Sequence, residues 1–257
     1  MNAFADQVFL LARRSIVRTA RQPANVVFPL AFPMLLLAVN SGGLKAETRL
    51  PGFPTSSFVA FALAVPFIQG ALFATMNAGT DLARDIQTGF LSRLSLTPMR
   101  GVALLAGQLG GVVTMGVIQA AVYLSVGLAV GVRPAAGALG VLVLFAFAVL
   151  VSLGFGALGA FAALRTGSGE AVQSIFPAFF VFLFISSMNI PRNLMKIRWF
   201  HDVATANPVS YLIECVRSLI ITGWDGQALG LGFGIAAAIA VVSLALSSWA
   251  LRVRMAR

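Results

Sequence analysis

Charged side chains are scarce in this chain, since Asp, Glu, Lys and Arg make up only 10% of its 257 residues. Soluble domains carry about 25% charged residues, so this composition provides too few charges to cover a surface in water. Hydrophobic residues reach 59%, and the mean hydropathy is +0.92. The composition therefore excludes a soluble globular protein and indicates an integral membrane protein.

Cysteine and histidine are almost absent, with one residue of each, Cys215 and His201. An internal disulfide is thus excluded, and so is a zinc site built from Cys and His, so we predict no metal site. We interpret His201 with Asp202 as an interfacial polar pair, and Cys215 as a small core residue. No Gly-x-x-x-x-Gly-Lys-Ser/Thr pattern occurs, which predicts that the chain itself binds no ATP or other cofactor. We also expect no removable leader sequence.

The charges that are present are mostly basic, 18 Lys and Arg against 8 Asp and Glu. A basic balance can indicate nucleic-acid binding, but cytoplasmic loops of membrane proteins also collect Lys and Arg. With six spans, eleven basic residues lie on the side of the two termini and seven on the other side. This distribution predicts that both termini are cytoplasmic and that nucleic acid is not a partner.

The apolar runs predict an all-α polytopic membrane protein that forms one transmembrane domain, 1–257. Roughly 20 apolar residues span a bilayer as a helix. We expect an interfacial helix at 1–25, in which Arg14, Arg18 and Arg21 share one face. Pro29 and Pro33 should kink the first span. The six predicted spans are 26–39, 58–78, 102–132, 135–164, 171–188 and 229–251.

The predicted spans hold no Asp, Glu, Lys, Arg or His in their cores. Ion-driven carriers need an ionisable group at depth, so a transporter of this composition would take its energy from a partner. A route for a hydrophobic substrate could be lined by Gln69 and by the aromatic residues Phe176, Phe179 and Phe180. Ordinary packing or lipid contact explains these phenylalanines equally simply.

A charged interval at 81–100 separates the second and third spans. If 85–96 is helical, Ile86, Phe90 and Leu94 fall on one side and Asp85 and Arg93 on the other. Thr97-Pro98 should end this helix, because proline has no N–H to donate. A short amphipathic helix along the membrane face can receive a soluble partner, or it can simply join two spans.

The segment 189–227 holds two short apolar helices on either side of Asn207-Pro208. Both are too short to cross a bilayer, which favours a re-entrant hairpin between spans five and six. Glu214 and Arg217 are three residues apart and are predicted to pair on the helix face. Such a pair could act in a gate or could only hold the hairpin in place.

The 81–100 interval resembles the loop between spans two and three of ABC-2-type permeases, most closely in their daunorubicin-resistance branch. The residues that carry the resemblance are Asp85, Gly89, Arg93, Leu94 and Pro98; many family members have Glu in place of Asp85. The resemblance implies the ABC-2 (type V) exporter fold, in which this loop is a coupling helix that docks on an ATPase subunit. These five residues are therefore the expected docking residues.

A second motif resembles the same family just before its last span, and it comprises Asn207, Pro208, Tyr211, Glu214 and Arg217. In that family the segment forms re-entrant helices at the extracellular mouth of the pathway, so these five residues are the expected gate. Together the two motifs imply a coupled transporter rather than a self-powered one.

The family resemblance also implies partners and a location. We expect two cytoplasmic ABC ATPase subunits that bind ATP and Mg, and a second permease as a homodimer or a heterodimer, in the bacterial inner membrane. The complex would export a hydrophobic or amphipathic substrate such as a drug, lipid or glycolipid. The alternatives are an ion-coupled secondary carrier of another family and a non-transport membrane scaffold.

Overall fold

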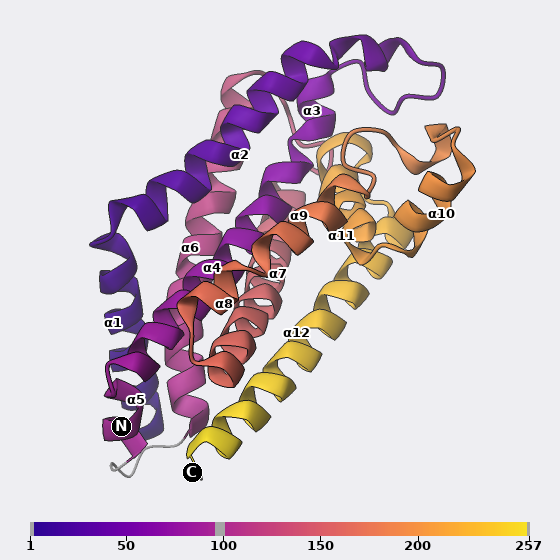
Figure 1. The fold of residues 1–257 in the computed structure, drawn as a ribbon. Helices are drawn as coiled ribbons and strands as arrows, with labels where there is room; N and C mark the ends of the chain where they lie inside the picture. Colours follow the sequence, from indigo (N-terminus) through magenta and orange to yellow (C-terminus); the bar gives the residue numbers. More distant parts are fainter. Residues whose placement is uncertain (1–2, 96–100, 256–257) are drawn as a thin grey trace.

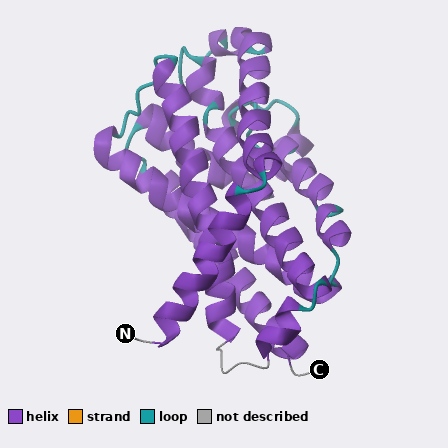
Figure 2. Ribbon diagram, turned by 90° about the vertical axis from the view of Figure 1, so that its left-hand side faces the viewer, coloured by secondary structure: helices purple, strands orange, loops and turns teal. Residues whose placement is uncertain are grey.

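The computed structural model describes residues 3–95 and 101–255, and within these ranges all regular structure is helical (Figure 1). A view turned by 90° shows the helices joined by short loops (Figure 2). The elements are α1 (Ala3–Ala20), α2 (Pro23–Gly43), η1 (Lys45–Arg49), α3 (Phe58–Ala62), α4 (Ala64–Gln87), α5 (Phe90–Ser95), α6 (Gly101–Ala129), α7 (Gly137–Thr166), α8 (Gly169–Gln173), α9 (Phe176–Phe184), η2 (Arg192–Leu194), α10 (Arg198–Ala206), α11 (Pro208–Arg217), the π-helical η3 (Ser218–Thr222) and α12 (Gly226–Met255).

Helix α4 forms the centre of the bundle and packs against α7, α6, α2, α8 and α11. In the segment Phe58–Gln87, which comprises α3 and α4, 94% of the most apolar 18-residue stretch is buried, against 17% for α2. Both termini lie at the same end of the bundle as α5 (Figure 1), which we call the terminal end. The opposite end, formed by α3, η1, α10 and α11, is called the far end.

Within residues 3–95 and 101–255, five segments are long and apolar enough to cross a membrane: α2, α3 with α4, α6, α7 and α12. The predicted fifth span, 171–188, is wrong as a continuous helix, because the chain there forms two short helices, α8 and α9, separated at Ser174 and Ile175. Pro177 lies in the first turn of α9 and has no N–H for the carbonyl four residues earlier. The segment still runs from the terminal end towards the far end (Figure 1).

The second apolar segment is interrupted at Leu63 and then continues well beyond its predicted end at residue 78, to Gln87. Pro66 explains the interruption, since it cannot donate to the carbonyl of Ala62. The extension places Asp81 and Asp85 on the last turns of this long buried helix. The polar face predicted for a separate loop helix is thus partly a face of α4.

Two prolines of α2 leave carbonyls without helical donors, and side chains of other helices supply the missing hydrogen bonds. Pro29 cannot bond to the carbonyl of Asn25, and Pro33 cannot bond to that of Pro29. Asn77 of α4 donates to the Asn25 carbonyl at 3.2 Å, and Tyr123 of α6 donates to the Pro29 carbonyl at 2.6 Å. Helix α2 therefore remains continuous through both prolines and is fastened to α4 and α6.

Glycines allow helices to approach closely, and two contacts illustrate this. Gly159 of α7 lies against the backbone of Thr75 in α4, where a Cβ would collide with the carbonyl oxygen. Gly107 and Gly111 of α6 lie against α1, so this Gly-x-x-x-Gly pair acts inside the subunit. The series Gly226, Gly230 and Gly234 instead faces open space.

Candidate functional site

The 81–100 interval is divided by a tight turn at Thr88 and Gly89. Gly89 has φ +69°, a left-handed conformation that glycine adopts without steric cost, and its N–H donates to the Ile86 carbonyl at 3.1 Å. Helix α5 begins at Phe90, so the predicted continuous helix 85–96 is wrong. Asp85 belongs to α4, whereas Arg93 and Leu94 belong to α5.

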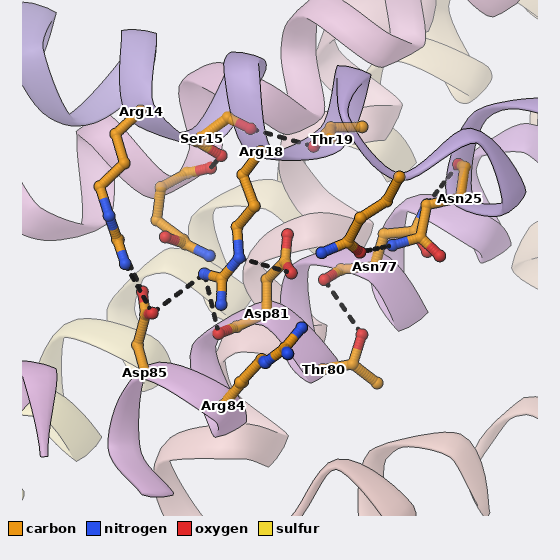
Figure 3. A network of polar contacts seen from close by, with 12 residues as sticks. Arg14, Ser15, Arg18, Thr19, Asn25, Asn77, Thr80, Asp81, Arg84 and Asp85 are labelled. Carbon is orange, nitrogen blue, oxygen red and sulfur yellow. Dashed lines mark hydrogen bonds and ion pairs between the residues drawn. The ribbon is translucent and has the colours of Figure 1, made fainter. Parts of the chain in front are cut away.

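The carboxylate of Asp85 points into the protein and is held by two arginines of α1 (Figure 3). Arg14 donates to both of its oxygens, with Nη1–Oδ2 at 2.9 Å and Nη2–Oδ1 at 2.8 Å. Arg18 Nη1 donates to Oδ1 at 2.9 Å. The side chain of Asp85 is 6% exposed, so the carboxylate itself is part of the protein interior.

Asp81 completes this cluster one helical turn earlier, with its Oδ1 3.4 Å from Arg18 Nε. Two arginines spaced by four residues on α1 thus meet two aspartates spaced by four on α4, and their formal charges cancel. The spacing puts each pair on one face of its helix. We call Arg14, Arg18, Asp81 and Asp85 the α1–α4 clamp.

Arg14 also connects the clamp to α5, because its guanidinium carbon lies 3.8 Å from the centre of the Phe90 ring. The hydrogen bond with Asp85 raises the pKa of Arg14, which remains charged throughout the physiological range. One arginine side chain therefore contacts the last turn of α4 and the first residue of α5. It links α1, α4 and α5 mechanically.

The other predicted docking residues lie in different environments. Arg93 is exposed on α5, while Leu94 packs against the apolar cluster at the terminal end. Gly89 forms the turn between the two helices, and Pro98 lies outside the described residues. The structure thus divides the motif into an internal residue, Asp85, a turn, and an exposed residue, Arg93.

Further hydrogen bonds join the terminal ends of α4, α7 and α12. Gln87 Nε2 donates to the Gly167 carbonyl at 3.2 Å, and Arg254 Nη1 donates to the Leu164 carbonyl at 2.7 Å. Gly167 ends α7 in a left-handed conformation, with φ +69°. A displacement of α4 at this end would therefore also move α7 and α12.

At the far end, Asn207 fixes the corner between α10 and α11. Its Oδ1 accepts the N–H of Val209 at 2.9 Å, and its Nδ2 donates to the Phe182 carbonyl at 2.5 Å. Pro208 follows as the first residue of α11, where a missing N–H costs nothing. Tyr211 donates its hydroxyl to the Thr205 carbonyl at 2.8 Å, which closes the corner.

The predicted Glu214–Arg217 pair is wrong, because each residue has other partners. Glu214 accepts from Arg192 of η2, at 2.8 Å to Nε and 2.6 Å to Nη2. Arg192 also lies 4.4 Å from the centre of the Tyr211 ring. The loop before α10 folds back over α11, so a partner 22 residues distant replaces the one three residues away.

Arg217 is 7% exposed and donates to three main-chain carbonyls. These are the carbonyls of Phe61 at 3.2 Å, Ser187 at 3.1 Å and Met188 at 3.2 Å. Its guanidinium also lies 3.5 Å from the centre of the Phe61 ring. The side chain therefore fastens the far ends of α3 and of the segment after α9 to α11.

A cavity of about 540 Å³ opens beside this group, between the loops and helices of the far end. Its walls combine charged and hydroxyl side chains, and the Oγ1 of Thr205 is buried without a hydrogen-bond partner among the described residues. Residues that line it include Arg192, His201, Thr205, Glu214, Arg217 and Asp225. Glu214 and Arg217 of the second motif therefore border a cavity that several charged and hydroxyl side chains share with apolar residues.

The predicted pathway residues lie in the body of the bundle. Phe176 and Phe180 have ring centroids 4.7 Å apart, and Phe180 lies 6.0 Å from Phe32 of α2. Phe179 contacts Phe155 of α7 at 5.9 Å. Gln69 is 1% exposed, and its Oε1 has no partner among the described residues. The phenylalanines thus form a half-buried seam between α9 and its neighbours, and the far-end cavity is lined by other residues.

Sequence reasoning missed the α1–α4 clamp, although a signal for it was present. The spacing of four between Arg14 and Arg18 matches that between Asp81 and Asp85. The arginines were interpreted as one interfacial face together with Arg21, but of the three Arg21 is exposed while Arg14 and Arg18 are half-buried. Two complementary pairs at equal helical spacing would have predicted contact between the helices.

The fold and its two polar ends define a multi-pass helical membrane protein of the transport-permease class. The chain belongs to the ABC-2 type transporter family, whose pattern it matches over residues 6–221. It is therefore a permease subunit rather than an ATPase, and this family implies association with ABC ATPase partners.

Individual relatives agree with this assignment. The chain is 31% identical over 230 residues to the daunorubicin resistance ABC transporter permease protein DrrB1 of Streptomyces coeruleorubidus, covering 86% of this chain and 77% of that protein. It is 25% identical over 221 residues to a putative transport permease ycf38 of Cyanophora paradoxa, covering 84% and 74% of the two chains. A ycf38 protein of Porphyra purpurea is 25% identical over 224 residues, with 86% and 76% covered.

Proposed function

We propose that this permease exports a hydrophobic or amphipathic molecule, driven by two cytoplasmic ATPase subunits that dock at the terminal end. The observation that supports the proposal is that the residues of the coupling motif lie in two different environments, one exposed and one buried. Arg93 is exposed on a short helix, while Asp85 is locked to α1 inside the protein. The exposed part can receive a partner, and the buried part can transmit its movement. ATP and Mg would be bound by the partner subunits.

Force on α5 has a defined route into the membrane region. Helix α5 joins α4 through the turn at Gly89, and Arg14 links both helices to α1. The bonds of Gln87 and Arg254 extend the connection to α7 and α12. Closure of the ATPase dimer would move this end of the bundle as a unit and open a path at an interface with a second permease.

Membrane orientation and assembly complete the proposal. The terminal end faces the cytoplasm of a bacterial cell, and 189–227, at the far end, forms a re-entrant gate at the external surface. Residues 1–257 act as one transmembrane domain in a homodimer or in a heterodimer with a related permease. The similarity to a daunorubicin resistance permease favours a drug-like substrate, and the half-buried phenylalanine seam of α9 suits an apolar one.

Transport by the reconstituted complex tests the function. The permease and an ABC ATPase from the same organism that copurifies with it would be placed in liposomes and supplied with ATP and a fluorescent apolar drug. We expect drug movement that requires ATP hydrolysis and persists with an ionophore. Movement that ignores ATP and collapses with the ionophore would favour a secondary carrier. Purification without any ATPase would favour a scaffold.

A charge reversal tests the docking surface separately. Arg93→Glu should lower ATPase binding by about tenfold, since one well-placed interface charge commonly contributes this much. Arg133→Glu is the matched control, because Arg133 is also exposed but lies between α6 and α7 at the far end. Equal ATPase binding by both variants would contradict docking at α5.

A further inference from the structure

A groove follows the elbow where α1 turns into α2. It has a volume of about 300 Å³ and is walled by α1, α2 and α6. The residues that line it are Ile16, Thr19, Ala20, Pro23, Val26, Val27, Gly111, Thr114, Met115 and Ile118. Apart from two threonines, none of these has a polar side chain.

The two threonine hydroxyls are already occupied by their own helices. Thr19 Oγ1 donates to the Ser15 carbonyl at 3.1 Å, and Thr114 Oγ1 donates to the Gly110 carbonyl at 2.9 Å. The groove therefore offers methyl and methylene groups rather than hydrogen-bond donors. Its occupant must be a hydrocarbon group, because a polar one would lose its bonds to water without replacement.

The rim of the groove is exposed to the surroundings of the protein. Val27 on α2 is 58% exposed and Ile118 on α6 is 43% exposed. In a membrane protein such apolar side chains face lipid. The acyl chain of a neighbouring phospholipid can thus enter the groove from the side.

Two free arginines lie close to the groove and give it a charge preference. Arg13, Ile16 and Ala20 follow one strip of α1, at spacings of three and four, and Arg21 directly follows Ala20. Both arginines are exposed and form no ion pair within the described residues, whereas Arg14 and Arg18 are neutralised by the α1–α4 clamp. Arg13 on α1 and Arg21 just after its end therefore carry the unpaired positive charge that an anionic headgroup beside the groove can reach.

We propose that this groove binds the acyl chain of one anionic phospholipid of the cytoplasmic leaflet, whose headgroup is held by Arg13 and Arg21. The site rests on the proposed orientation of the terminal end, and it is separate from the docking helix α5. The bound lipid would fill the elbow between α1 and α2. It would couple the position of α1 to the surface charge of the membrane.

Native mass spectrometry of the detergent-purified permease tests the proposal, with phosphatidylglycerol and phosphatidylcholine of identical acyl chains as probes. We expect the wild-type chain to retain phosphatidylglycerol about thirtyfold more tightly, since each of the two arginines contributes about 1 kcal/mol near an anionic headgroup, and 1.4 kcal/mol corresponds to tenfold. Arg13→Gln with Arg21→Gln should abolish this preference. Arg133→Gln at the far end should leave it unchanged.

A second variant tests the groove itself. Ile118→Trp fills it and should release both lipids, whereas Val126→Trp, on the same helix and 37% exposed, should release neither. Unchanged lipid retention in Ile118→Trp would overturn the proposal, as would equal binding of the two lipids by the wild-type chain. Stoichiometric displacement of lipid by the transported drug would also overturn it and assign the groove to substrate.

The lipid-binding experiment and the transport experiment can fail independently of each other. Loss of ATP-driven transport with the lipid preference intact would remove the exporter function and leave the lipid site standing. ATP-driven transport by a wild-type chain that shows no lipid preference would remove the lipid site and leave the exporter function standing.

Discussion

The two ends of the molecule hold arginine in different ways. At the terminal end, Arg14 and Arg18 are neutralised by the carboxylates of Asp81 and Asp85. At the far end, Arg217 is held by three main-chain carbonyls and an aromatic ring. A carboxylate partner is specified by sequence, whereas a carbonyl partner exists at every residue. The carboxylates of the terminal end therefore connect two particular helices, α1 and α4. The carbonyl partners of Arg217 are set by which backbone segments the fold places beside it.

The largest effect is expected from Asp85→Lys, which places three cations in one buried group. Breaking a buried ion pair costs about 3–5 kcal/mol, so we expect the free energy of unfolding in detergent to fall by about 4 kcal/mol. Chemical denaturation followed by tryptophan fluorescence measures this loss. Asp202→Lys, at a side chain that is 66% exposed, should change little; equal losses in both variants would contradict a buried clamp.

Replacing Arg217 tests the carbonyl arrangement. Arg217→Gln removes donors from three carbonyls, and an unsatisfied buried group costs about 1–3 kcal/mol, so we expect a total loss of about 3 kcal/mol. Arg217→Lys should recover only part of it, because an ammonium lacks the planar fork of donors. Arg198→Gln, at an exposed arginine, is the control. Full recovery by lysine would show that charge alone matters there.

Tyr123→Phe tests a main-chain carbonyl whose side-chain donor is an uncharged hydroxyl group. The Pro29 carbonyl would lose the hydroxyl of Tyr123, its only side-chain donor among the described residues, and we expect a loss of about 1.5 kcal/mol. The background Pro33→Ala restores a backbone N–H four residues after Pro29. In that background the same tyrosine change should cost clearly less. An unchanged cost would mean that Tyr123 stabilises the bundle through packing alone.

The smallest effect concerns Glu214, for which two double-mutant cycles discriminate between the possible partners. The pair of Glu214 with Arg192 is partly exposed, with side chains 22% and 24% exposed, so we expect a coupling energy of about 0.5–1 kcal/mol. The cycle with Arg217 should give a smaller value. A larger coupling to Arg217 would restore the pairing predicted from helical spacing.

Hydropathy predicted most of the fold, because apolar runs and their separation are written in the sequence. The six predicted apolar regions correspond to α2, α3 with α4, α6, α7, α8 with α9, and α12. The errors lie where one residue changes the backbone. Pro177 divides the fifth region, and nothing stops α4 before Gly89. Neither the break at Pro177 nor the extension of α4 changes the mean hydropathy of its segment, so a hydropathy analysis could not predict them.

The candidate site was predicted less completely, because its contacts join distant segments. The motifs drew attention to Asp85 and Asn207, whose hydrogen-bond partners come from α1 and α9. Helical spacing favoured Arg217 as the partner of Glu214, while the fold brought Arg192 nearer. Local periodicity predicts neighbours on one helix, and it carries no information about a loop that folds back.

The turn at Gly89 has a consequence for how this permease could change its partner. A side chain added there would meet no atom within 4 Å, yet the backbone conformation still demands glycine. Helix α5 is anchored to the protein by Phe90, which contacts Arg14, and by Leu91 and Leu94, which pack in the apolar cluster at the terminal end. Under the proposed docking, new ATPase specificity could therefore arise by exchanging the exposed Arg93 while the anchoring residues and the turn stay the same.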